Sequence, residues 1–111
     1  MGIQVVNKRN HRSNTVIDVY IGRPSILGNP FPIGAQYSRE ECIKEYDIWI
    51  AKEIENHNPE VCRELDRIAD LNRKYGRVNL ICYCAPLACH GDIIKKIIEK
   101  RFIESYNKNW R

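Results

Sequence analysis

The most reactive part of the sequence is the segment Cys-Tyr-Cys-Ala-Pro-Leu-Ala-Cys-His-Gly-Asp, which ends at Asp92. It places three thiols, an imidazole and a carboxylate between an aliphatic run and an amphipathic helical pattern. Cys89, His90 and Asp92 fall at the expected start of that helix, where free backbone N–H groups and the helix dipole lower the pKa of a thiol and attract anions. The segment therefore predicts a catalytic site at these three residues, with Cys89 or Asp92 as nucleophile and His90 as acid or base.

The same segment has two other interpretations. Cys82, Cys84, Cys89 and His90 have the ligand types of a tetrahedral zinc site, although their spacing differs from the usual Cys-x-x-Cys knuckle. Alternatively, Asp92 is an N-cap, the thiols are small core residues, and His90 bonds to backbone. No cofactor is expected in the catalytic interpretation, and zinc is expected in the first alternative.

A second loop, Ile-Gly-Arg-Pro-Ser-Ile-Leu-Gly-Asn-Pro-Phe, carries groups suited to an anionic ligand. Arg23 offers a bidentate fork to phosphate or carboxylate, and Ser25 and Asn29 offer hydrogen bonds to a ribose or base. Gly22 and Gly28 permit a sharp turn and close approach of a ligand. The loop contains no Walker or dinucleotide fingerprint, and its structural interpretation is a rigid turn. The predicted ligand-binding residues are Gly22, Arg23, Ser25, Gly28, Asn29 and Cys84.

Three helices are expected around these loops. Ser38 and Glu41 form a capping box before a helical repeat of apolar residues. A second helix starts at Asn58 and Pro59, an N-cap followed by proline at the first helical position, and ends at Gly76. The closing helix begins within the Cys-His-Gly-Asp segment.

The strands before the two loops determine whether the loops can meet. Residues 16–21 are rich in β-branched side chains, and residues 78–84 are apolar on both alternating faces, which is typical of a central strand covered by helices. The order strand, loop, two helices, strand, loop and helix favours parallel pairing, so both loops would leave from carboxyl ends. Ligands bind at these ends in open α/β sheets. Residues 23–29 and 84–92 are therefore expected to form one pocket.

Length and composition predict one compact, Rossmann-like α/β domain with a small, mainly parallel sheet flanked by helices. This domain spans residues 1–111, with a polar amino-terminal extension at 1–15 and a core at 16–104. Within the extension, the polar residues after a short apolar run are expected to form a loop or a wide hairpin connection. The chain has 43% hydrophobic and 29% charged residues, as an ordinary globular domain does.

Charge and cysteine content limit the partners. A net charge of +4 suits an anionic small molecule such as a nucleotide and is compatible with weak nucleic-acid contact, but it falls short of the basic stripe of a dedicated nucleic-acid binder. No signal peptide or membrane-spanning stretch is expected. Five cysteines cannot all pair within one chain, so we expect reduced thiols in the cytoplasm. The sequence does not indicate an oligomeric state.

Both motifs together resemble a small family of phage and bacterial proteins that is defined as a domain of unknown function. The resemblance covers roughly residues 16–98 and rests on the motifs IGRPSxLGNPF and CxCxPxxCHGD. It implies a phage or bacterial source, with the host cytoplasm as location if the protein is phage-encoded, and it assigns no catalytic role. The positions that match the signature are Gly22, Arg23, Gly28, Asn29, Pro30, Cys82, Cys84, Pro86, Cys89 and His90.

We therefore expect a phosphorylated or nucleotide-like small molecule to bind between the two loops, with hydrolysis or group transfer on a nucleotide derivative as the reaction. Arg23 and the helix amino terminus would hold the anion. Alanine at Cys89 or His90 should abolish turnover with little loss of stability, because neither is expected in the core. The alternatives are a zinc-stabilised module that binds nucleic acid or protein, and a phage factor that interacts with a host protein without activity or metal.

Overall fold

The chain folds as a small α/β domain, as the sequence predicts. The computed structural model describes residues 2–11, 14–31, 33–34, 36–84 and 87–109, with side chains as far as Arg101. Within these ranges the elements are β1 (Gly2–Asn7), β2 (Asp18–Tyr20), α1 (Arg39–Glu55), α2 (Pro59–Tyr75), β3 (Arg77–Cys82) and α3 (His90–Asn109). The strands form one sheet in the order β1-β3-β2, and both pairs are parallel. None of the described helices has the length and apolar character needed to cross a membrane.

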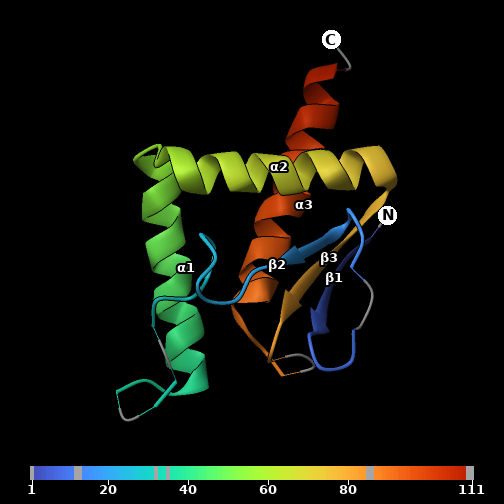
Figure 1. The fold of residues 1–111 in the computed structure, drawn as a ribbon. Helices are drawn as coiled ribbons and strands as arrows, with labels where there is room; N and C mark the ends of the chain where they lie inside the picture. Colours follow the sequence, from blue (N-terminus) through green and yellow to red (C-terminus); the bar gives the residue numbers. More distant parts are fainter. Residues whose placement is uncertain (1, 12–13, 32, 35, 85–86, 110–111) are drawn as a thin grey trace.

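β3 is the central strand, in agreement with its apolar side chains on both faces. Val78, Leu80, Ile81 and Cys82 are all buried. The three helices lie to the left of and above the sheet in Figure 1, and the connection from β1 to β2 runs along its other side. Helices therefore cover one face of β3, and an irregular segment covers the other.

The first strand extends the sheet beyond the predicted core of residues 16–104. Gly2–Asn7 pairs with Arg77–Cys82, and Ile3 belongs to the hydrophobic core, although residues 1–15 have the polar composition of an extension. The connection after β1 is a parallel crossover and not the hairpin that the sequence suggested. Because β1 and β2 lie on opposite sides of β3, this connection has to cross the central strand.

The helix ends confirm the predicted capping signals. Ser38 Oγ accepts a hydrogen bond from the Glu41 N–H at 3.2 Å, and Glu41 Oε1 accepts one from the Ser38 N–H at 3.0 Å. Asn58 caps α2, and Gly76 ends it in the left-handed conformation with φ of 76°. These signals fix where α1 begins and where the chain turns back into β3.

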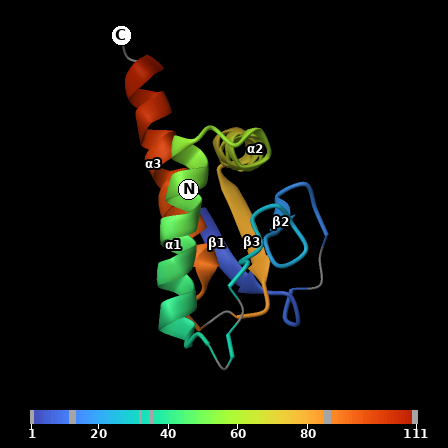
Figure 2. The ribbon, with the colours of Figure 1, turned by 90° about the vertical axis from the view of Figure 1, so that its left-hand side faces the viewer.

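The packing of the helices places two of their amino termini at the carboxyl edge of the sheet. α1 and α3 are in contact, and α2 packs across both, toward the end where β3 begins (Figure 2). The strands point toward the lower part of Figure 1, where α1 and α3 both start. Tyr46 of α1 is buried below this edge, and its hydroxyl donates a 2.7 Å hydrogen bond to the Leu27 carbonyl. The site is therefore assembled from strand ends and helix starts.

A polar network anchors the β1–β2 connection to the central strand. The Asp18 side chain is only 2% exposed and accepts hydrogen bonds from the Asn79 amide at 2.9 Å and the Thr15 N–H at 2.7 Å. Its Oδ1 also lies 2.8 Å from His11 Nε2. Burial by itself would raise the pKa of Asp18, but the hydrogen bonds from Asn79, Thr15 and His11 outweigh it and lower this pKa from 3.8 to about 2.

This network predicts an acid-sensitive part of the stability. The folded state favours the Asp18 carboxylate, so its contribution is complete above pH 4 and is lost as the pH falls toward 2, which amounts to roughly 2 kcal/mol. Asp18→Asn should lower the free energy of unfolding by about that amount at pH 7 and flatten its dependence between pH 4 and 2. Urea denaturation at several pH values measures both effects, with the exposed Asp47→Asn as control. Unchanged stability and an unchanged acid limb in Asp18→Asn would contradict the role of the network.

Candidate functional site

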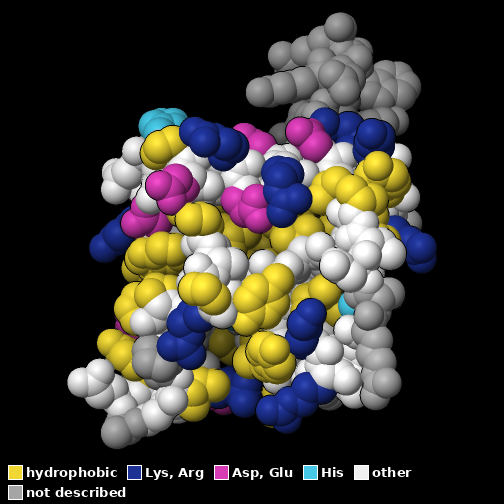
Figure 3. Space-filling model, in the orientation of Figure 1, with side chains coloured by type: hydrophobic (Ala, Val, Ile, Leu, Met, Phe, Trp, Pro, Cys, Tyr) yellow, Lys and Arg dark blue, Asp and Glu magenta, His cyan; other side chains and the backbone are white. Residues whose placement is uncertain are grey.

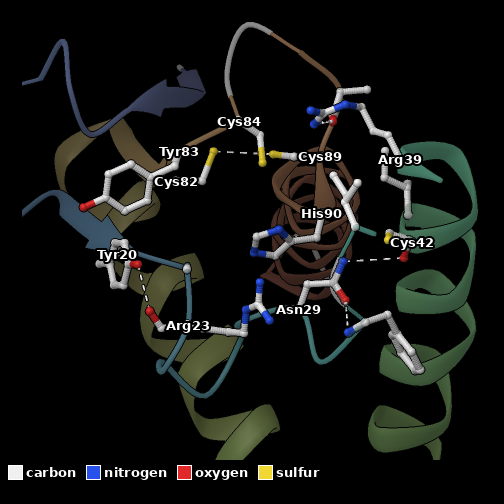
Figure 4. A pocket seen from close by; sticks show the side chains of 15 residues that line it. Tyr20, Arg23, Asn29, Arg39, Cys42, Cys82, Tyr83, Cys84, Cys89 and His90 are labelled. Atoms are coloured by element: carbon white, nitrogen blue, oxygen red, sulfur yellow. Dashed lines mark hydrogen bonds between the residues drawn. The ribbon is translucent and has the colours of Figure 1, made fainter. Parts of the chain in front are cut away.

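A cavity of about 430 Å³ opens at the carboxyl edge of the sheet, between the two loops that the sequence singles out. Its walls come from the end of β2 and the following loop, the first turn of α1, the end of β3 and the start of α3 (Figure 4). Arg23 and Asn29 lie on one side, and Cys84, Cys89 and His90 lie on another. The two distant motifs therefore meet around one concavity, as the parallel pairing predicts.

One buried hydrogen bond joins the two motifs directly. His90 Nε2 lies 2.7 Å from the carbonyl oxygen of Ile21, which is the residue immediately after β2. Gly91 makes this approach possible, because a Cβ at that position would lie 2.9 Å from Val5 Cγ1 and 3.0 Å from Ile21 Cδ1. The start of α3 is thus seated on the sheet at the place where the first loop leaves it.

The first loop is held by its own turns and by α1. The Ser25 N–H donates to the Gly22 carbonyl and the Gly28 N–H donates to the Ser25 carbonyl, both at 2.9 Å. A Cβ on Gly28 would lie 3.0 Å from Arg23 Cα, so the glycine allows the loop to close on itself. Ser25 and Gly28 do not line the cavity, so the structure gives them a role in shaping the loop and not the predicted ligand contact. The Arg23–Pro24 peptide bond is cis.

Asn29 lines the cavity and also braces the loop. Its Oδ1 accepts a 2.8 Å hydrogen bond from the Phe31 N–H, and its Nδ2 points to the Cys42 carbonyl at 3.5 Å. The short bond uses one of the two lone pairs of Oδ1. Nδ2 carries two hydrogens, and its one contact, with the Cys42 carbonyl, is long. It can therefore donate to an acceptor on a ligand.

Cys89 differs from the activated thiolate that the sequence predicts. The residue is 3% exposed, its Sγ lies 3.5 Å from Cys82 Sγ, and it accepts a hydrogen bond from the Gly91 N–H at 3.3 Å. The hydrogen bond with the Cys82 thiol and burial raise the pKa of Cys89 far above its usual range, and the helix amide opposes them only in part. The helix terminus therefore does not lower this pKa as expected.

Asp92 lies outside the cavity, in the first turn of α3. Its Oδ2 accepts a hydrogen bond from the Cys89 N–H at 3.1 Å, while Cys89 Sγ caps the Gly91 N–H in return. The side chain is exposed and does not line the cavity. Asp92 is thus the third residue of α3 and bonds to the N–H of Cys89, which precedes the helix; it is not the N-cap of the alternative interpretation, and it makes no contact for the predicted catalytic role.

His90 is a neutral imidazole with one nitrogen already in use. It is 7% exposed, and because a carbonyl oxygen can only accept, Nε2 carries the proton that bonds to Ile21. Burial lowers the pKa of His90, the bond to Ile21 partly opposes this, and the charge of nearby Arg23 lowers it further. Nδ1 is then unprotonated, which suits a base or a hydrogen-bond acceptor.

The expectation that Cys89 and His90 lie outside the core is wrong. Both are buried, and Cys89 belongs to the main hydrophobic cluster. Alanine at either position would leave a void, and at His90 it would also leave the Ile21 carbonyl without its donor. Loss of activity in those variants would therefore not separate catalysis from folding.

The alternative zinc site is not assembled in the described residues. Cys82, Cys84 and Cys89 all line the cavity, but no group of three or more Cys, His, Asp or Glu side chains described in the structure has the arrangement needed to hold a metal. A zinc ion bound through His90 Nε2 would have to break the bond to Ile21. Ala85 and Pro86 of the motif lie outside the described residues.

Positive charge dominates the cavity walls. Arg23 and Arg39 are its charged lining residues, and no Asp or Glu is among the described residues that line it. Arg39 is the first residue of α1, and its Nη1 donates a 3.1 Å hydrogen bond to the Ala88 carbonyl. This bond links the start of α1 to the segment just before α3. On the face in Figure 3, acidic side chains gather mainly over α2, whereas Lys and Arg alternate with hydrophobic side chains below.

Four charged or aromatic lining residues were not among the predicted site residues: Arg39 and the aromatic residues Tyr20, Phe31 and Tyr83. A signal for Arg39 was present. It follows the N-cap of the first helix after a strand, and such a helix starts at the carboxyl edge of a parallel sheet. The aromatic residues carried no comparable signal, because strand tyrosines are as common in cores as in sites.

The geometry predicts an order of thiol reactivity. Cys62 and Cys84 are partly exposed, whereas Cys42, Cys82 and Cys89 are buried. Brief alkylation of the native protein with iodoacetamide at pH 7.5 should modify Cys62 and Cys84 first and leave Cys89 protected, as peptide mass spectrometry would show. Modification of Cys89 as fast as Cys84 would restore the activated thiolate that the sequence predicts.

Comparison with known proteins confirms that the chain resembles a domain of unknown function. Residues 4–100 match a protein family described as a domain of unknown function, DUF4326. The match begins within β1, well before residue 16, where the motif resemblance starts. Searches of curated proteins and of solved structures gave no match. Because the family covers most of the chain, the protein belongs to the DUF4326 domain family.

Proposed function

We propose that the protein binds a phosphorylated, nucleotide-like small molecule in the cavity between its two loops. The observation that carries the proposal is the pair Arg23 and Arg39 in one cavity whose described lining holds no carboxylate. The four ion pairs between described residues involve neither arginine. Two unneutralised guanidinium groups in a concavity favour an anion that can accept several hydrogen bonds.

The surrounding backbone favours the same kind of ligand. α1 and α3 both begin at the cavity, and helix amino termini carry partial positive charge. The cavity also lies at the carboxyl ends of parallel strands, where Rossmann-like folds bind nucleotides. A phosphate between Arg23, Arg39 and these helix starts would meet positive potential from several directions.

The remaining walls suit a planar base. Phe31 lies beside Asn29 on the loop, and Tyr20 and Tyr83 line the opposite side. Aromatic faces stack on nucleobases of any identity. A volume of about 430 Å³ lies toward the lower end of the range for small-molecule sites, which favours a mononucleotide over a dinucleotide.

We further propose that His90 acts as the base in hydrolysis or group transfer on the bound nucleotide. Its Nδ1 can accept a proton from water or from a substrate hydroxyl, while Nε2 stays bonded to Ile21. Cys89 and Asp92 have no part in this version, because one is a protonated buried thiol and the other bonds to the backbone at the start of α3. From the free cysteines and the motif resemblance, we further propose a cytoplasmic setting in a bacterium or a phage-infected host.

The arginine pair gives the direct test of binding. Arg23→Ala and Arg39→Ala should each weaken nucleoside monophosphate binding by about tenfold or more, because each removes a charged hydrogen-bond donor from the anion. Isothermal titration calorimetry with the four ribonucleoside monophosphates measures the affinities. Arg63→Ala, on the exposed side of α2, is the matched control and should bind as the wild type does. Equal affinities for all variants, or no binding by the wild type, would refute the proposal.

His90→Gln tests the catalytic extension with less damage to the fold than alanine. Glutamine keeps an N–H group for the Ile21 carbonyl but has no basic nitrogen, so binding should persist while turnover falls about a hundredfold. Wild-type turnover should be flat above pH 7 and should fall on acidification through a pKa below 6.5, because the neutral ring is the active form. Chromatographic assay of the nucleotide products measures both. Full turnover in His90→Gln would exclude His90 as the base.

A further inference from the structure

We propose that the phosphate bound in the cavity is the terminal phosphate of a single-stranded nucleic acid, whose following nucleotides leave over Tyr20 and Tyr83 toward Arg9 and Lys8. This inference rests on the proposed function and names the form in which its nucleotide ligand arrives. We call these four residues the exit shelf. The shelf is distinct from the arginine pair, which holds the phosphate inside.

The two tyrosines connect the inside of the cavity to its outside. Both line the cavity, yet Tyr20 is 36% exposed and Tyr83 is 52% exposed. Their ring centroids lie 6.3 Å apart with the planes at 78°, and Figure 4 shows them next to each other on the side away from Arg39. A strand leaving the cavity on this side would meet two aromatic faces in succession.

The shelf is held in place by the backbone around it. The Tyr20 hydroxyl donates a 2.8 Å hydrogen bond to the Arg23 carbonyl, so its ring is fixed beside the phosphate end of the cavity. The carbonyl of Tyr83 accepts a 3.2 Å hydrogen bond from the Asn7 side chain. Side chains that are already held in place lose little conformational entropy when a base stacks on them, which favours binding at these rings.

Positive charge continues beyond the tyrosines. The guanidinium carbon of Arg9 lies 6.0 Å from the centroid of the Tyr83 ring, and the Lys8 N–H donates a 2.7 Å hydrogen bond to the Cys82 carbonyl. Asn7 Oδ1 accepts from the Arg9 N–H at 2.9 Å, which closes a turn that keeps Arg9 there. Lys8 and Arg9 are exposed, and neither takes part in an ion pair between described residues.

This arrangement fits a polyanion better than a free nucleotide. A mononucleotide satisfies Arg23 and Arg39 inside the cavity and leaves Lys8 and Arg9 without an anionic partner. Cations that alternate with exposed aromatic rings are the pattern of single-strand binding, in which bases stack and phosphates follow the charge. The cations are few, so the contact is short and suits the end of a strand instead of a long tract.

An unpaired strand is required because stacking on Tyr20 and Tyr83 needs free base faces. In a duplex those faces are covered by neighbouring base pairs, and only phosphates and groove edges are accessible. A cavity of about 430 Å³ also suits one nucleotide better than a base pair. The terminal phosphate can be at the 5′ or the 3′ end, and both ends offer the same dianion to the arginine pair.

Fluorescence anisotropy with short labelled oligonucleotides tests the inference. Pentanucleotides with a 5′-phosphate, with a 3′-phosphate or with neither are compared with a blunt hairpin duplex, and mononucleotide affinity is measured separately by calorimetry. At least one phosphorylated pentanucleotide should bind about tenfold or more tighter than the mononucleotide, and removal of its phosphate should abolish that gain. The duplex should bind more weakly than the tighter of the two phosphorylated strands.

The double variant Lys8→Ala/Arg9→Ala separates the exit shelf from the cavity. It should reduce pentanucleotide affinity to the mononucleotide level without changing mononucleotide affinity, whereas the control Arg63→Ala/Lys74→Ala on α2 should change neither. Equal binding of the pentanucleotide and the mononucleotide by the wild type overturns the inference and leaves the proposed function standing. Equal binding of phosphorylated and unphosphorylated strands, or of the duplex, also overturns it. No binding of any of these ligands would overturn both.

Discussion

The hydrogen bond from His90 to the Ile21 carbonyl is the interaction on which the site depends. It joins residues that are 69 positions apart, at 2.7 Å, in a part of the structure that is almost closed to solvent. Parallel pairing of β2 with β3 brings the two motifs to one edge of the sheet, but it does not fix their separation. The imidazole does so, because a buried carbonyl without its donor is costly and the bond therefore resists opening.

The same burial decides which chemistry is left for the cavity. The Cys89 thiol accepts a hydrogen bond from the Gly91 N–H at the start of α3 and contacts the Cys82 thiol. The Asp92 carboxylate accepts a hydrogen bond from the Cys89 N–H. Groups that look reactive in the sequence thus hold the architecture together. The groups that line the cavity and remain available are the two arginines, the aromatic rings, the Asn29 amide and the partly exposed Cys84 thiol, together with the second nitrogen of His90. Charge recognition and stacking, and not thiol chemistry, are therefore the principal capacities of this surface.

Local signals predicted the helices well, because a cap or a stop acts on its own neighbours. The Ser38–Glu41 box, the Asn58 cap and the left-handed Gly76 are examples. The meeting of the two loops was also predictable, since it follows from strand direction. Burial was not predictable, because it depends on residues distant in the chain. A Cβ at Gly91 would crowd Val5 and Ile21, and β1 precedes a polar stretch that hides its pairing with β3. This is why Cys89 was expected to be reactive and residues 1–15 were expected to be an extension.

The central claim is that both loops and both helix starts surround a single anion site. Backbone amide chemical shifts of the ¹⁵N-labelled protein, followed by NMR during titration with a nucleoside monophosphate, test it most directly. Saturable shifts should be confined to residues 20–31, 33, 39–43, 82–84 and 87–91, the segments that line or support the cavity. Shifts concentrated instead on α2, or in only one of the two loops, would show that the ligand does not bind between them and would contradict the claim.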